Sequence, residues 1–148
     1  MIATLPVLLG AGGGFLLAVL WFDLMFDVQA RRLDDPAGDA RLTSIADYYR
    51  RVTIEAFPAN RLVAGVMLIT VAASVVGLWR EPSLKALVRV LLVVGPVALA
   101  ARRVVPNAMR LGARADDLPT QRELARGILW DHVACFACIV GFLASLVA

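Results

Sequence analysis

His132 and Asp131 are adjacent polar residues near the start of the last long apolar segment, in the stretch GILWDHVACFACIVGF. His132 is the only histidine of the chain, and histidine is the side chain whose ordinary pKa lies closest to neutral pH. A histidine with a neighbouring carboxylate can accept and release protons, so these two residues are the candidate catalytic acid or base. The alternative is that a single histidine at a helix end has only a structural role.

Asp23 and Asp27 form a second polar feature, at the end of the first apolar segment. Residues four apart share one face of a helix, so the two carboxylates predict a proton site, a cation site or a paired acid and base. The alternative is that they form salt bridges that fix the helix ends, with Arg61, Arg102 or Arg103 as partners.

Cys135 and Cys138 lie one helical turn apart, just after His132. A zinc site needs three or four protein ligands, and no second cysteine or histidine cluster completes one with Asp131 and His132. A thioredoxin-like redox motif needs a different context, a helix N-terminus in a soluble βαβ unit. We therefore predict no metal site and interpret the cysteines as small packing residues.

The composition indicates that these residues lie in a membrane protein. Of the 148 residues 60% are hydrophobic and 18% are charged, and the mean hydropathy is +0.76. Segments of this length and apolarity predict an all-α integral membrane protein with four transmembrane helices in an antiparallel bundle, forming one domain over residues 1–148. The first segment lacks the basic start of a signal peptide and is interpreted as a retained helix. The predicted spans are residues 3–23, 62–79, 86–103 and 127–148.

The basic residues are distributed unevenly along the chain. Twelve of the 15 Lys and Arg residues lie between the first and second spans or between the third and fourth. The positive-inside rule therefore places both long loops in the cytoplasm and both termini outside. This pattern explains the net charge of +3 without a nucleic-acid partner, and the preference for Arg over Lys favours a bacterial inner membrane.

Both long loops contain further helix signals. In TSIADYYRRVTIEAF apolar residues recur at helical spacing, which predicts an amphipathic helix over residues 44–57 on the cytoplasmic membrane surface, capped by Ser44 with Asp47, with its tyrosines at headgroup depth. The second loop predicts a short turn or helix around Met109. Thr120 and Glu123 form a capping box that starts the last helix near residue 121.

The predicted topology brings polar residues together at the cytoplasmic ends of all four spans. A helical wheel places Asp131 on an interior face with Cys135 and Cys138, and places His132 at a seam or toward lipid. Charges at this depth are costly unless paired or hydrated, so we expect them to line a cytoplasm-facing pocket. The predicted members are Asp23, Asp27, Asn60, Arg61, Arg103, Asn107, Trp130, Asp131 and His132.

Two stretches carry a family resemblance. VVPNAMRL and RELARGILWDHVACF resemble the C-terminal half of the anthrone-oxygenase-like family of small four-helix membrane proteins. In that family an Asn follows a Pro after the third helix, and a Trp and a His open the fourth. The resemblance covers about a third of the chain and implies that Asn107, Trp130 and His132 are the matching positions. It implies a four-helix fold more than it implies oxygenation.

Two hypotheses for function follow. In the first, the pocket binds or oxidises a small aromatic or quinone-like molecule that partitions into the bilayer. His132 or Asp131 would accept a proton, Arg61, Arg103 or Asn107 would bind the resulting oxyanion, and Trp130 would stack on the ring. In the second, the polar cluster is structural, and the protein acts by binding lipids, a partner subunit or further copies of itself. The sequence identifies no cofactor.

Overall fold

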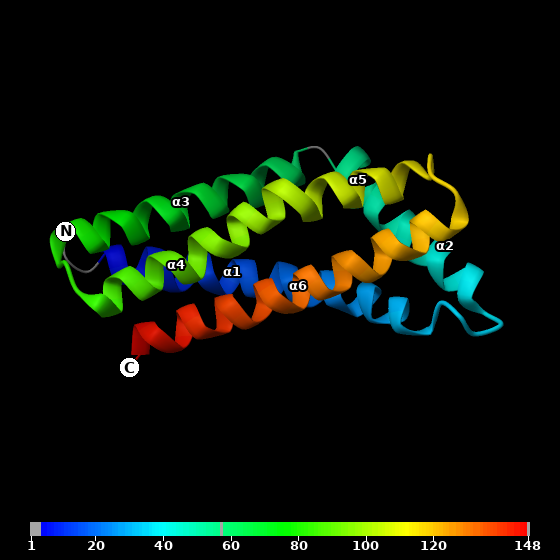
Figure 1. Ribbon diagram of the computed structural model, residues 1–148. Helices are drawn as coiled ribbons and strands as arrows, with labels where there is room; N and C mark the ends of the chain where they lie inside the picture. The colour runs from blue at the N-terminus through cyan, green and yellow to red at the C-terminus, as the bar shows by residue number, and fades with distance from the viewer. Residues whose placement is uncertain (1–3, 57, 148) are drawn as a thin grey trace.

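The computed structural model describes residues 4–56 and 58–147, and every regular element in these ranges is helical. The chain runs through long and short helices in turn, and α1 begins at the same end of the molecule at which α6 ends (Figure 1). The elements are α1 (Thr4–Asp27), η1 (Val28–Arg32), α2 (Gly38–Tyr49), η2 (Arg50–Glu55), α3 (Ala59–Arg80), α4 (Leu84–Leu99), η3 (Ala100–Val104), α5 (Val105–Ala113) and α6 (Leu118–Val147).

Four helical segments are long and apolar enough to cross a membrane, which confirms that part of the sequence prediction. They extend farther toward the charged end of the molecule than the predicted spans, because α1 continues into η1 and α4 continues through η3 into α5. Residues 3 and 148, the outer limits of two predicted spans, lie outside the described residues. The observed segments are Leu5–Arg32, Asn60–Arg80, Leu84–Ala113 and Leu118–Val147.

Small residues set the contacts among the long helices, in which α1 and α4 each pack against both α3 and α6. A Cβ atom on Gly12 would lie 2.2 Å from Thr70 Oγ1 of α3, and one on Gly13 would lie within 3 Å of the side chains of Phe142 and Leu143 on α6. Thr70 and Phe142 are themselves fully buried. Glycine therefore lets α1 approach both neighbours closely, as the sequence predicted for this helix.

The predicted surface helix packs inside the protein instead. It begins at Gly38, so Ser44 lies within the helix and is not its cap, and it continues as a π-helix from Arg50 to Glu55. Ile45 and Tyr49 are 0% and 2% exposed, so the prediction of tyrosines at headgroup depth is wrong for Tyr49. The apolar face of α2 joins a core with α5 and α6, which buries more apolar area than a membrane surface would. Residue 57, the end of the predicted helix, lies outside the described residues.

Close backbone contact fixes the junction of α2 and η2. A Cβ on Gly112 of α5 would lie 2.7 Å from the backbone nitrogen of Arg50, so only glycine permits this approach. The contact holds Tyr49 at the C-terminal end of α2, next to α1 and α6. A helix near Met109 was predicted from the sequence, and it is α5 that provides this contact.

The start of α6 also differs from the prediction. The helix begins at Leu118, and the Asp117 side chain accepts a hydrogen bond from the Thr120 backbone N–H at 3.2 Å. That hydrogen bond lowers the pKa of Asp117 from its ordinary value. Asp117 therefore caps the helix, and the predicted Thr120–Glu123 capping box near residue 121 is displaced by three residues.

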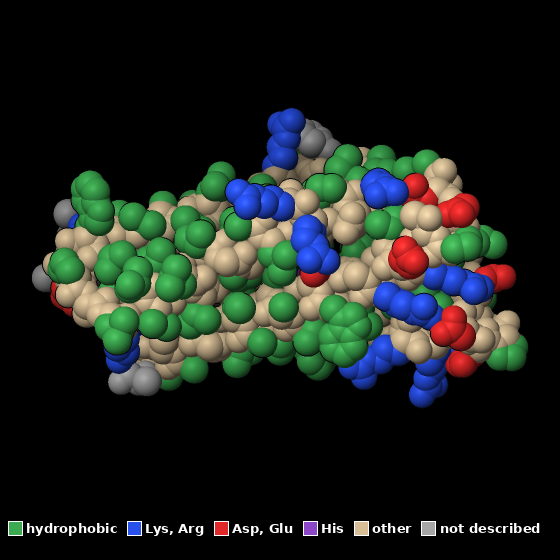
Figure 2. Space-filling view, viewed as in Figure 1, with side chains coloured by type: hydrophobic (Ala, Val, Ile, Leu, Met, Phe, Trp, Pro, Cys, Tyr) green, Lys and Arg blue, Asp and Glu red, His purple; other side chains and the backbone are tan. Residues whose placement is uncertain are grey.

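Charged side chains gather at the end of the molecule that holds α2 and α5, whereas mainly hydrophobic side chains cover the body of the long helices (Figure 2). Three ion pairs connect the α2 segment with the second loop and α6 across this end. They are Arg114–Asp47 at 2.6 Å, Arg122–Asp39 at 2.7 Å and Arg126–Asp34 at 2.6 Å. The exposed pairs fix relative positions more than they stabilise, because such pairs contribute about 0–1 kcal/mol each.

Candidate functional site

His132 and Asp27 form the centre of a buried polar cluster. The His132 Nδ1 atom lies 2.7 Å from Asp27 Oδ2, which connects α6 with α1. Asp27 is fully buried and His132 is 5% exposed. The wheel-based prediction that His132 lies at a seam or toward lipid is therefore wrong. A buried carboxylate on one ring nitrogen fixes the orientation of an imidazole and directs the other nitrogen elsewhere.

Tyr49 completes the surroundings of Asp27. Its hydroxyl donates a hydrogen bond to Asp27 Oδ1 at 2.6 Å and lies 3.4 Å from His132 Nδ1. Burial, followed by the negative charge of Asp27, raises the pKa of Tyr49 well above its ordinary value. The hydroxyl therefore stays protonated and acts as a donor, and each Asp27 oxygen has its own partner.

Asp23 faces the other nitrogen of the imidazole. Asp23 Oδ2 lies 3.8 Å from His132 Nε2, while Oδ1 accepts a 2.5 Å hydrogen bond from the Tyr48 hydroxyl. Burial and the charge of Asp23 raise the pKa of Tyr48, which therefore also remains a donor. The Tyr48 ring stacks on Phe26 with centroids 4.1 Å apart. At 3.8 Å the Nε2 and carboxylate atoms are too far apart for a direct hydrogen bond, so a ligand atom or water can lie beside both.

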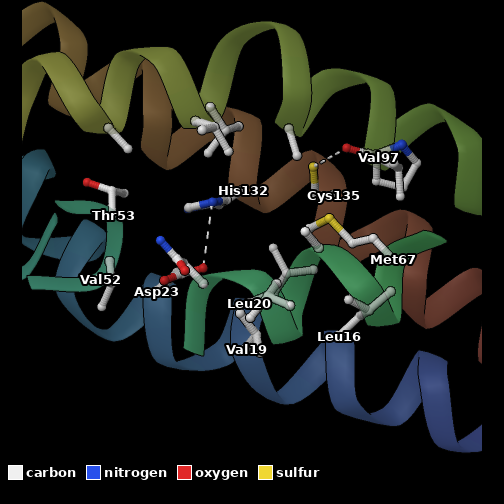
Figure 3. Close-up of a pocket in the computed structure, with 18 of the residues that line it drawn as sticks. Leu16, Val19, Leu20, Asp23, Val52, Thr53, Met67, Val97, His132 and Cys135 are labelled. Atoms are coloured by element: carbon white, nitrogen blue, oxygen red, sulfur yellow. Dashed lines mark hydrogen bonds and ion pairs between the residues drawn. The ribbon is translucent and has the colours of Figure 1, made fainter. Parts of the chain in front are cut away.

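His132 and Asp23 lie at one side of a cavity of about 520 Å³ between the long helices. Figure 3 shows both side chains directed toward the space that Leu16, Val19, Met67 and Val97 also line. Most of the lining is aliphatic, and Tyr49, Thr53, Asn60 and Arg61 add polar groups. A mainly apolar cavity of this size with few polar groups is typical of small-molecule sites.

Asp131 lies in a separate interaction. It is 8% exposed, and its Oδ2 atom lies 3.2 Å from Arg103 Nε. Asp131 and His132 point in different directions, as adjacent residues on a helix must. Neither Asp131 nor Arg103 lines the cavity. The structure therefore separates these two predicted site residues from His132.

Two other predicted site residues also lie outside the cavity. Trp130 is 58% exposed, and the Arg31 guanidinium lies 5.5 Å from the centre of its ring. Asn107 is half-buried on α5 and does not line the cavity. In contrast, Asn60 and Arg61 line it from the start of α3. Of the nine predicted site residues, Asp23, Asn60, Arg61 and His132 line the cavity, and Asp27 supports His132 from behind.

Cys135 lines the cavity one turn beyond His132, and its thiol lies 3.8 Å from the Pro96 carbonyl oxygen, an interaction drawn in Figure 3. Cys138 is half-buried, and both cysteines are free thiols. Within residues 4–56 and 58–147 no group of three His, Cys, Asp or Glu side chains is arranged to hold a metal ion.

Sequence reasoning missed Tyr48 and Tyr49 as members of the site. Their apolar rings suited a membrane-surface helix, so their hydroxyls were not considered as partners for buried carboxylates. One signal was present, since two carboxylates four apart in an apolar helix need donors, and two consecutive tyrosines can supply them.

Comparison with protein-family models, with curated proteins and with solved structures finds no match to this chain. The resemblance to the anthrone-oxygenase-like family therefore stays a prediction, and the residue geometry alone carries the functional argument.

Replacement of Tyr49 by phenylalanine tests the role of its hydroxyl. The variant removes one hydrogen bond to a buried carboxylate, so we expect it to lower the free energy of unfolding by about 1.5–3 kcal/mol. Thermal unfolding in detergent, followed by circular dichroism, measures the change. Tyr48→Phe is the matched variant and should have a smaller effect, because Tyr48 is only partly buried. Equal stability of Tyr49→Phe and the parent protein would contradict this role.

Proposed function

We propose that the four apolar helices form an antiparallel bundle in a bacterial inner membrane, with both termini outside and both long loops in the cytoplasm. The proposal is supported by the exposed apolar side chains along the long helices and by the position of the arginines in the two long loops. Reporter fusions test the orientation. A cytoplasmically active reporter inserted after Asp35 should be active, and one inserted after Pro82 should be inactive; the reverse pattern would contradict the proposed topology.

We propose that the cavity binds a small aromatic or quinone-like molecule and that His132 exchanges a proton with it. The observation that carries this proposal is the position of His132 Nε2, which faces an apolar cavity while a buried carboxylate holds Nδ1. Such a cavity suits a molecule that partitions into the bilayer, and its polar side would meet a hydroxyl or carbonyl group of that molecule.

The chemistry follows from the neutral form of His132 whose Nδ1–H is donated to Asp27. In that form Nε2 carries a lone pair toward the cavity and can take a proton from an acidic O–H or C–H group of the ligand. Asp27 and Asp23 are the negative groups that stabilise the imidazolium formed. Asn60 and Arg61 line the same cavity and are the candidates to bind the anionic oxygen that develops on the ligand.

Molecular oxygen is the oxidant if the bound anion is oxidised further. In the reaction that the family resemblance implies, a methylene group between two aromatic rings loses two hydrogens. One oxygen atom of O₂ becomes the new carbonyl, and the other leaves as water together with those hydrogens. In this scheme His132 carries the first proton. The positions of Asp131, Arg103, Asn107 and Trp130 outside the cavity assign them no direct contact with the ligand.

Anthrone is a suitable probe for binding and for oxygen uptake. Calorimetric titration of the purified protein in lipid nanodiscs should show saturable binding of anthrone, and an oxygen electrode measures its consumption. Ala64→Trp fills the cavity from α3 and should abolish binding, whereas Ala72→Trp places the same ring on an exposed part of α3 outside the cavity and should not. Equal binding by both variants, or none by the parent protein, would contradict the proposal for this class of ligand.

The alternative function is that of a non-enzymatic membrane protein that acts through lipids or a partner subunit. The observation that favours it is that the tyrosine–aspartate hydrogen bonds satisfy the buried carboxylates internally and connect α1 with α2. This cluster would then only hold helix ends together. Under this alternative Asp23→Asn lowers stability, and no bound aromatic molecule copurifies with the protein in native mass spectrometry.

A further inference from the structure

A second hollow lies on the outer side of the contact between α1 and α6, away from the cavity described above. Its volume is about 320 Å³, and its lining is formed by Trp21, Leu24, Met25, Val28, Arg31, Leu129 and Val133. No residue lines both this groove and the cavity that contains His132. All but one of the lining residues are apolar, and the exception is Arg31 at the charged end of the molecule.

The groove has a defined direction. Trp21 and Arg31 are ten residues apart, which corresponds to about 15 Å along a helix. Arg31 lies close to the last residue of the first membrane-length segment, whereas Trp21 lies well inside that segment. The groove therefore runs from the end of the span toward its middle, with the cation at the outer end. An acyl chain below a lipid headgroup has the same direction and the same change in polarity.

Arg31 is held in place without charge neutralisation. Its guanidinium lies over the exposed Trp130 ring, and the structure describes no carboxylate in ion-pair contact with it in residues 4–56 and 58–147. The acidic residues that follow it in the chain, Asp34 and Asp35, are paired with Arg126 and Arg41. A cation at the membrane boundary, fixed by an aromatic ring and next to an apolar groove, complements a lipid phosphate.

We propose that this groove, formed by α1 and α6, binds one anionic phospholipid. The phosphate contacts Arg31, and one acyl chain lies along Val28, Met25 and Trp21. Trp130 is a positioning residue, because it holds the guanidinium at the end of the groove. This site is independent of the proposed chemistry at His132, so either proposal can fail alone.

Native mass spectrometry of the full chain tests the proposal. The protein is titrated in detergent with phosphatidylglycerol or with phosphatidylcholine of the same chain length. We expect one tightly bound phosphatidylglycerol and at least fivefold weaker binding of phosphatidylcholine. Arg31→Ala should weaken phosphatidylglycerol binding about five- to tenfold, as expected for the loss of one cation near a lipid headgroup. Arg80→Ala removes an exposed arginine from the end of α3 and should leave the affinity unchanged.

A second pair of variants tests the apolar part of the groove without changing charge. Val28→Trp fills the groove and should also weaken phosphatidylglycerol binding, whereas Val7→Trp, at an exposed position near the other end of α1, should not. Inorganic phosphate at millimolar concentration should fail to displace the lipid. Unchanged binding in Arg31→Ala and Val28→Trp, equal affinity for the two lipids, or displacement by phosphate would overturn the proposal.

Discussion

Replacement of His132 by glutamine should lower the rate of anthrone consumption about 100- to 10,000-fold, the range typical of the loss of a positioned acid or base. Glutamine can keep a hydrogen bond to Asp27 but cannot take up a proton at the position of Nε2. Anthrone binding measured by calorimetry should change much less than the rate, because the apolar walls of the cavity remain. Oxygen uptake in nanodiscs measures the rate.

Cys138→Ser is the matched control on the same helix, since Cys138 does not line the cavity. It should retain the parent rate, which would also argue against a redox role for the cysteine pair. A His132→Gln variant that consumes anthrone at the parent rate would contradict the account of the chemistry, whatever its effect on stability.

Removal of the Asp27 carboxylate should cause the largest loss of stability in the chain. Asp27→Ala leaves His132 and the Tyr49 hydroxyl without their buried partner, and breaking a buried polar pair on one side costs about 3–5 kcal/mol. Thermal unfolding in detergent should show this as a strongly lowered melting temperature. Asp27→Asn keeps the size and one acceptor oxygen, so we expect an intermediate loss.

Asp34→Ala provides the comparison with an exposed carboxylate. Asp34 forms an ion pair with Arg126 at the surface, and its removal should leave the melting temperature nearly unchanged. If Asp27→Ala and Asp34→Ala had equal effects, the buried cluster would not hold α1, α2 and α6 together as described.

The sequence predicted the long helices well because their signal is local. A run of apolar residues of membrane length needs no tertiary information, and all four such runs are helical in the described residues. The helix ends were less predictable, since α1 and α4 continue as 3-10 and π-helical turns into segments whose charges suggested loops. These continuations depend on contacts with α2 and α6, which a local pattern does not contain.

The orientation of His132 shows where pattern reasoning reached its limit. The interior face of α6 was inferred from its small residues, which favoured Asp131 and Cys135 and placed His132 outside. In the structure Asp131, His132, Cys135 and Ile139 are all buried, so the interior face is wider than one stripe. The additional neighbour is α2, which the sequence placed on the membrane surface. Its burial brings Tyr49 to Asp27 and converts one predicted pair of carboxylates into a cluster with His132.

The central claim is that His132 Nε2 faces a ligand cavity while Asp27 holds Nδ1. Nitrogen-15 NMR of the protein in nanodiscs tests it directly, because the chain has a single histidine and the assignment needs no second variant. We predict that saturating anthrone shifts the Nε2 signal and leaves the Nδ1 signal nearly unchanged. Unchanged signals from both nitrogens, or a shift confined to Nδ1, would contradict the account.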